Sequence, residues 1–195
     1  MDFAFIVKRA QGILFTPKIE WPIIEAENAG HSRVLLAWLL PMSLIPAIAG
    51  VIGYGLIGFS AGGMHFASIS WGLRQGLSQL VGILGGAYVT AFIINALAEK
   101  FASRKNIDKA FALVAYAYAP ACLGGVLQII PSMAFIGSLI GLYSLYLLYV
   151  GLSPLMQTPP EKNTSFFAAS IICAIVVFLV FSGVLAVIFM PGIMS

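Results

Sequence analysis

The side chains best suited to metal or redox chemistry in this chain are two cysteines and two histidines. Metal sites and redox motifs need such residues at short spacings or on facing elements. Cys122 and Cys173 are far apart in the sequence and lie within long apolar runs, and His31 and His65 lie on opposite sides of the first such run. We therefore expect no metal and no cofactor, and we expect both cysteines to be small buried hydrophobic residues.

Motifs of enzyme catalysis are also missing from the sequence. It contains no HExxH, no GxSxG and no phosphate-binding glycine loop, the short signatures of metallohydrolases, serine hydrolases and nucleotide-driven proteins. Ionisable side chains within a membrane would suggest a transport pathway, but Arg74, Glu99 and Lys100 lie only at the ends of apolar runs. We therefore expect a protein that is not an enzyme and that has no catalytic residues.

The most regular polar groups inside the apolar runs are tyrosines. Tyr143, Tyr146 and Tyr149 are three residues apart, so in a helix they form a strip on one side. A buried phenol needs a hydrogen-bond partner. The candidate partners are neutral groups on other helices, namely Gln79, Asn95, Gln128 and the carbonyls freed near Pro120. We favour aromatic packing between helices, and a neutral polar pore is the alternative.

The elements that position these residues follow from composition. The chain of 195 residues is 61% hydrophobic and 9% charged, and its mean hydropathy is +1.01. Such a composition is typical of an integral membrane protein, and an apolar run of roughly 20 residues crosses the hydrocarbon core as a helix. The predicted fold class is all-α, a polytopic protein with five transmembrane helices. We place them near Val34–Phe59, Leu73–Ala98, Ala110–Ile130, Ser132–Met156 and Phe166–Met190, with a tight hairpin between the third and the fourth.

Glycines recur at helical spacing within these runs. Gly82 with Gly86 and Gly137 with Gly141 form GxxxG pairs, which allow two helices to approach closely in lipid. Packing inside one five-helix bundle is the simpler explanation. A homo-oligomer is the alternative.

The basic residues predict the orientation in the membrane. The chain has 10 Lys and Arg residues and a formal net charge of +3. All but Arg74 precede the first run or lie in the second-to-third and fourth-to-fifth connections. Since Lys and Arg are held on the cytoplasmic side during insertion, we expect the N-terminus in the cytoplasm and the C-terminus outside. Charges spread over short connections do not form a nucleic-acid-binding patch.

Residues 1–33 form a separate cytoplasmic segment before the five-helix domain of residues 34–195. Apolar residues recur from Phe3 to Leu14 at helical spacing, while Lys8, Arg9 and Gln11 occupy the other side. This pattern is typical of an amphipathic helix that lies in the membrane interface. The charged pair breaks the apolar run and no small-residue cleavage site follows, which argues against a signal peptide.

Three segments of the chain resemble one known family. They are TPKIEWPIIEAE (residues 16–27), YAYAPACLGGVLQIIP (residues 116–131) and LYSLYLLYVGLSPLMQTPPEKN (residues 142–163). Together they resemble the Yip-one domain family of five-helix membrane proteins, and the most specific part is YLLYVGLSPLMQTPPEK. The chain is more similar to the short bacterial members than to the eukaryotic small-GTPase-interacting ones. It lacks the Asp-Leu-Tyr-Gly-Pro element of the latter, which argues against GTPase binding.

The resemblance implies a non-enzymatic, multi-pass protein of the bacterial inner (cytoplasmic) membrane with a membrane-organising or adaptor role. The alternative is a small-molecule or lipid permeation protein, that is, a channel or transporter. The implied partners are membrane lipids and a protein at the cytoplasmic face, without nucleic acid. The candidate interaction residues lie in the three matching segments, and they are Pro17, Trp21, Glu25, Tyr116, Pro120, Tyr146, Tyr149, Gly151, Pro159, Pro160 and Glu161.

Overall fold

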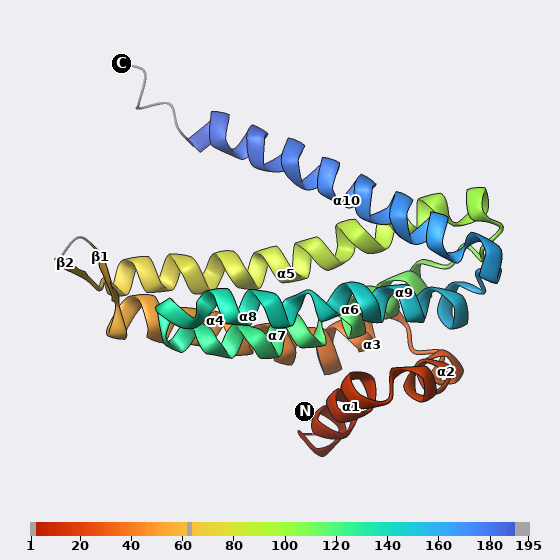
Figure 1. The fold of residues 1–195 in the computed structure, drawn as a ribbon, viewed down its shortest axis with the longest axis horizontal. Helices are drawn as coiled ribbons and strands as arrows, with labels where there is room; N and C mark the ends of the chain where they lie inside the picture. The colour runs from red at the N-terminus through yellow and green to blue at the C-terminus, as the bar shows by residue number, and fades with distance from the viewer. Residues whose placement is uncertain (1–2, 62–63, 190–195) are drawn as a thin grey trace.

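The computed structural model describes the backbone of residues 3–61 and 64–189 and the side chains of residues 3–60 and 64–179. The described chain is an elongated helical bundle with a short two-stranded sheet at one end (Figure 1). Five of its helical runs are long and apolar enough to cross a membrane, which confirms the predicted number of spans. They are His31–Ile57, Ile69–Phe101, Ile107–Ile129, Pro131–Met156 and Pro160–Leu179.

The first span is built from four short helical pieces. They are α3 (His31–Val34), the π-helical turn η1 (Leu35–Leu39), α4 (Leu40–Ile52) and a second π-helical turn, η2 (Gly53–Ile57). Pro41 and Pro46 lie in α4, where neither can donate a helical hydrogen bond. The span begins three residues before the predicted Val34, because the Asp108 carboxylate accepts a hydrogen bond of 2.9 Å from the His31 backbone N–H.

Between the first two spans the chain forms a β-hairpin, which the all-α prediction did not include. Strand β1 (Phe59–Ala61) pairs antiparallel with β2 (Met64–Phe66). Gly58 ends the first span with a φ of 72°, a value that glycine adopts without steric cost. Phe59 was predicted to end the first helix, but it lies beyond this turn and stacks on Phe66 at 5.5 Å between ring centroids.

The remaining spans are also interrupted, except for the last. The second span contains α5 (Ile69–Leu97) and η3 (Ala98–Phe101), and the third contains α6 (Ile107–Ala117), α7 (Ala119–Gly124) and η4 (Gly125–Ile129). The fourth span contains η5 (Pro131–Met133), α8 (Ala134–Gly141) and α9 (Tyr143–Met156), and the fifth is α10 (Pro160–Phe189). The break between α6 and α7 precedes Pro120, which cannot continue the hydrogen-bond ladder. Helix α10 starts six residues before the predicted Phe166, because Pro160 suits the first turn of a helix.

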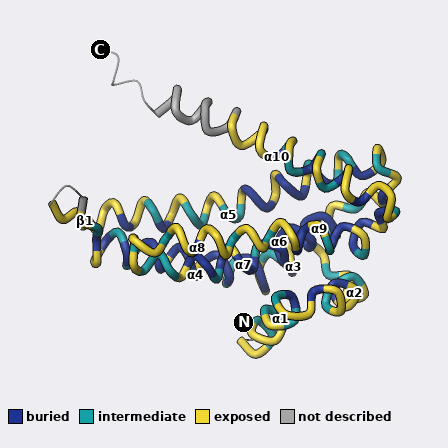
Figure 2. The backbone as a smooth tube through the Cα atoms, in the orientation of Figure 1, coloured by how far each residue is buried: buried dark blue, intermediate teal, exposed yellow. Residues whose placement is uncertain are grey.

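The core runs along the middle of the bundle, where α6 and α7 are the most buried elements (Figure 2). Trp38 lies against Tyr116 at 4.9 Å between ring centroids, and its indole N–H donates to the Ala115 carbonyl at 3.0 Å. Across the bundle, Gln79 and Gln128 exchange two amide hydrogen bonds of 2.5 and 3.1 Å. These two amides satisfy each other, so neither of these two candidates is the partner of a tyrosine in the strip.

Glycines allow several close helix approaches among the described residues, and Gly137 of the predicted pairs makes one of them. A Cβ on Gly72 would lie 2.6 Å from the Gly55 Cα, and a Cβ on Gly137 would strike the Gly124 carbonyl oxygen. At Gly82, in contrast, a Cβ would have no neighbouring atom within 4 Å. Packing inside the bundle therefore explains Gly137, while Gly82 lies on an open helix face.

Candidate interaction site

The first two helices form a hairpin against one side of the bundle. Helices α1 (Phe3–Phe15) and α2 (Pro17–Glu27) lie at the end opposite to the β1–β2 hairpin (Figure 1). They are joined at Thr16, whose backbone N–H and hydroxyl both donate to the Gly12 carbonyl, at 2.9 and 3.1 Å. Pro17 starts α2, as the Thr-Pro pair predicts, and Asn28 ends it in a left-handed conformation with φ 47°.

Trp21 anchors this hairpin on the fourth span. Its side chain is 0% exposed, and it lies so close to Gly151 that a Cβ there would be 2.7 Å from the indole Cε2. Pro17 is buried on the same helix, and the hydroxyl of Tyr143 on α9 donates to the Leu14 carbonyl at 3.0 Å. An indole with its polar N–H suits the level of the lipid headgroups, but the structure places Trp21 inside the protein, because a glycine on α9 leaves room for the ring.

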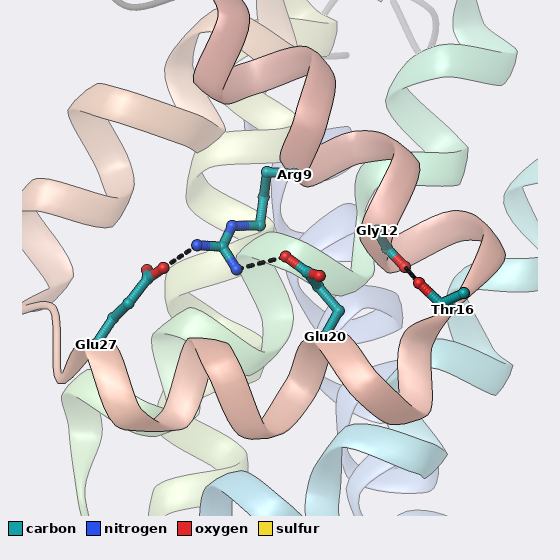
Figure 3. A network of polar contacts seen from close by, with 5 residues as sticks. All are labelled: Arg9, Gly12, Thr16, Glu20 and Glu27. Carbon is teal, nitrogen blue, oxygen red and sulfur yellow. Dashed lines mark hydrogen bonds and ion pairs between the residues drawn. The ribbon is translucent and has the colours of Figure 1, made fainter.

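A buried arginine holds the two helices of the hairpin together (Figure 3). Arg9 is 5% exposed, and its guanidinium donates to Glu20 at 2.6 Å and to Glu27 through its other terminal nitrogen. It also lies 5.7 Å from the centre of the Tyr116 ring. The prediction that Arg9 belongs to the exposed polar side of α1 is therefore wrong. Two carboxylates and an aromatic face replace the water that this cation would otherwise require.

A second buried cation joins the hairpin to the third span. Lys109, at the start of α6, is 5% exposed. Its ammonium donates to the Glu25 backbone carbonyl and lies 3.6 Å from the Glu25 carboxylate. Beside it, the His31 ring is 2.5 Å from the Asp108 carboxylate. The hairpin is thus fixed to the third and fourth spans by ionic and aromatic contacts together.

The connection between the fourth and fifth spans is held just as firmly. Thr158 is buried; its hydroxyl donates to the Leu152 carbonyl at 3.2 Å and accepts from the Ser103 hydroxyl at 3.0 Å. The Arg104 backbone N–H donates to the Met156 carbonyl at 2.7 Å. The two connections on this side of the bundle are therefore hydrogen-bonded to each other.

The structure brings together some of the predicted interaction residues and separates others. Pro17, Trp21 and Glu25 lie on α2 of the docked hairpin, and Tyr116 and Gly151 lie on the spans against it. Pro159, Pro160 and Glu161 lie at the start of the fifth span, and Tyr149 of the fourth span contacts Thr164 there. Pro120 is buried in the bundle. Tyr146 is 43% exposed and stacks only on Tyr143 among the described residues. All of these positions remain predictions with respect to binding.

Four residues that matter to this site were not singled out from the sequence. They are Arg9, Lys109, Thr158 and Arg33. A signal for the first existed, since Glu20 and Glu27 are seven residues apart and therefore share one face of α2.

In the described part of the chain no group of three or more His, Cys, Asp or Glu side chains could hold a metal ion. The arrangement can hold helices in register and present charge, but it places no nucleophile beside a base.

Comparison with known sequences settles the family. The Yip1 domain matches residues 12–193. The chain belongs to the Yip1 domain family. The match includes the end of α1, the whole of α2 and all five spans, while residues 3–11 of α1 lie before it. The resemblance noted from the three sequence segments is confirmed.

Two curated relatives agree with this assignment. This Yip1 domain protein is 26% identical over 171 residues to the "Inner membrane protein YohC" of Escherichia coli strain K12, which covers 85% of this chain and 88% of the relative. The protein of the same name from Escherichia coli O6:H1 gives the same values. No solved structure matches the chain. The prediction of a multi-pass inner-membrane protein is confirmed by these relatives together with the five spans.

Proposed function

We propose that this Yip1 domain protein is a non-enzymatic membrane protein that organises or adapts other components at the cytoplasmic face of the inner membrane. The observation that carries the proposal is the docked N-terminal hairpin. Its two helices are fixed to the third and fourth spans through buried Trp21, Arg9 and Lys109. A segment fixed in this way presents a surface of defined shape, which an unstructured tail would not.

The proposed orientation puts the hairpin and the two adjoining connections in the cytoplasm and the C-terminus outside. It is supported by the distribution of cations in the described chain, since the side that carries the hairpin holds Lys100, Arg104, Lys105 and Lys162, while the β1–β2 side holds Arg74. The final residues 190–195, on which part of this prediction falls, lie outside the described residues.

We expect alkaline phosphatase fused after Ser195 to be active in cells and the same enzyme fused after Lys105 to be inactive, because the phosphatase folds only after export. The measurement is phosphatase activity normalised to the amount of fusion protein. An inactive fusion at Ser195 combined with an active one after Lys105 would reverse the orientation.

The surface proposed to bind a partner is formed by the two connections beside the hairpin. Gln157, Pro160, Glu161 and Lys162 are exposed there, and the Ser103–Thr158 hydrogen bond joins the connection that carries them to the neighbouring one. A protein partner is the occupant proposed for this surface. The permeation alternative is less well supported, because Gln79 and Gln128 satisfy each other and Tyr146 lies on the outer face of α9.

Photo-crosslinking in living cells tests the adaptor role. A photoreactive residue at Gln157 or Lys162 is expected to give a reproducible adduct with one other protein, and the same residue at the exposed His65 of β2 is expected to give none. Thr158→Val, which removes the hydroxyl that joins the two connections, should lower the adduct yield at unchanged expression. Adducts only with lipid or with a second copy of the chain would remove the support for a docking surface.

A further inference from the structure

A polar pocket lies where the N-terminal hairpin meets the first span. It has a volume of about 240 Å³ and is lined by Phe5, Glu27, Arg33, Val34, Ala37 and Tyr116 among others. The acidic and basic residues lie at its rim, at the beginning of the span, and the apolar residues continue along α3 and η1. This is the level at which a membrane protein meets lipid headgroups.

Two hydrogen-bond donors in this pocket have no partner among the described residues. Tyr116 is 3% exposed, yet its hydroxyl makes no hydrogen bond within that part of the chain. Arg33 has no described carboxylate within ion-pairing distance. The ring of Tyr116 is buried, but its hydroxyl opens into the pocket, and Arg33 is exposed, so a ligand that enters there can accept hydrogen bonds from both groups.

The charges around the pocket favour an anion. Glu27 also faces it, but its carboxylate accepts from Arg9, which is shared with Glu20. Lys8 lines the adjoining pocket, which has a volume of about 250 Å³ and shares Phe5 and Glu27 with the first. Lys8, Arg9 and Arg33 thus face Glu20 and Glu27, so that three cations oppose two carboxylates and one positive charge remains. A guanidinium with a neighbouring hydroxyl suits a phosphate group in particular, because a phosphate accepts several charge-assisted hydrogen bonds.

A second, wholly separate pocket continues the same helix face deeper into the span. It also has a volume of about 240 Å³, and it is lined only by apolar side chains of α1 and α4, namely Phe3, Ile6, Pro41, Met42, Leu44 and Ile45. From Ala37 to Leu44 the chain advances about 10 Å at 1.5 Å per residue. Both pockets therefore lie between α1 and one side of the first span, the polar one nearer the start of the span and the apolar one deeper.

We propose that one phospholipid spans these two pockets between the hairpin and the first span, with its phosphate at Arg33 and Tyr116 in the polar pocket and an acyl chain along Phe3, Ile6 and Leu44 in the apolar one. A soluble anion would use the polar pocket but not the apolar one. A diacylglycerol would use the apolar pocket, but it has no negative charge to oppose the Arg33 guanidinium. A phospholipid is the ligand class that fills both pockets and satisfies both donors.

Native mass spectrometry of the full-length protein, released from detergent in the presence of dioleoyl phosphatidylglycerol, tests this site. The wild-type protein is expected to retain one phosphatidylglycerol, and Arg33→Gln is expected to raise the dissociation constant roughly 10-fold, as the loss of a charge-assisted hydrogen bond does. Tyr116→Phe should raise it about 3-fold. Arg104→Gln is the matched control, because Arg104 is an exposed cation on the same side of the bundle with no place in the pocket.

Three outcomes would overturn the proposal. The first is equal retention of phosphatidylglycerol by Arg33→Gln and Arg104→Gln. The second is equal retention of dioleoylglycerol and phosphatidylglycerol by the wild type, which would leave the phosphate without a role. The third is that inorganic phosphate stabilises the folded protein as much as the lipid does, which would assign the pocket to a free anion. If Arg33→Gln does not fold, Ala37→Phe, which fills the pocket without removing charge, must weaken retention by a similar factor.

Discussion

Replacement of Gly151 by leucine is expected to release the N-terminal hairpin from the bundle. A Cβ at this position would lie 2.5 Å from Leu113 Cδ1 and 2.7 Å from Trp21 Cε2, and both of these side chains are fully buried. Neither the ring nor the branched chain has space to move aside, so the larger residue must displace α2 from α9. Overpacking of this kind costs roughly 3 kcal/mol, and it separates Trp21, the main aromatic anchor of the hairpin, from the fourth span.

Thiol labelling in membranes measures this release. With Cys122 and Cys173 replaced by alanine, a cysteine introduced at the buried Ile24 of α2 should be protected in the parent protein and should react rapidly with maleimide once Gly151→Leu is added. Gly82→Leu is the control, because no atom lies within 4 Å of a Cβ at that position, and protection at Ile24 should be kept. Protection that survives Gly151→Leu would show that Trp21 is not the anchor.

Replacement of Arg9 by methionine is expected to destabilise the protein by about 3 kcal/mol, since the loss of one member of a buried ion pair leaves its partners as uncompensated charges. Glu20 would carry most of this cost, because its side chain is 15% exposed while that of Glu27 is 38% exposed. The adjacent Lys8→Met serves as the control. Lys8 is exposed and has no ion pair among the described residues, so this change should be close to neutral.

Unfolding in mixed detergent micelles, followed by far-UV circular dichroism, gives the free energies of unfolding of Arg9→Met and Lys8→Met. A third variant separates charge from packing. Arg9→Met combined with Glu20→Gln and Glu27→Gln removes all three charges and should recover much of the lost stability, because neutral amides are less costly to bury than unpaired carboxylates. Equal unfolding midpoints for Arg9→Met and Lys8→Met would contradict the role of Arg9.

The five spans could be predicted from the sequence because their signal is length. A helix must hold roughly 20 apolar residues to cross the hydrocarbon core, and this requirement is local, so it is visible without knowing any neighbour. The ends of the spans depended on contacts that are not local. The Asp108 carboxylate that caps the first span at His31 comes from the third span, 77 residues away. The residue pattern near His31 therefore does not indicate this contact.

The interior of the candidate site was harder to predict for a related reason. Arg9 reads as a surface residue because a lone cation is rarely buried, and only the paired positions of Glu20 and Glu27 on a packed α2 make its burial possible. Amides on neighbouring spans and the carbonyls near Pro120 were candidate partners for Tyr143 and Tyr149. They bond instead to the Leu14 carbonyl, which is left unpaired near the end of α1, and to the Thr164 hydroxyl of α10.

The contacts of the hairpin also fix the order in which this protein can be assembled. The Arg9–Glu20 pair joins residues 11 apart, so α1 and α2 can associate as soon as they are synthesised. The contacts from Glu25 to Lys109 and from Leu14 to Tyr143 join residues 84 and 129 apart, and the second cannot form until the fourth span has entered the membrane. The hairpin can therefore complete its docking only after the fourth span has been inserted. A docked hairpin therefore indicates that synthesis and insertion have reached the fourth span. In a chain stalled earlier, Trp21 would not be covered by α9.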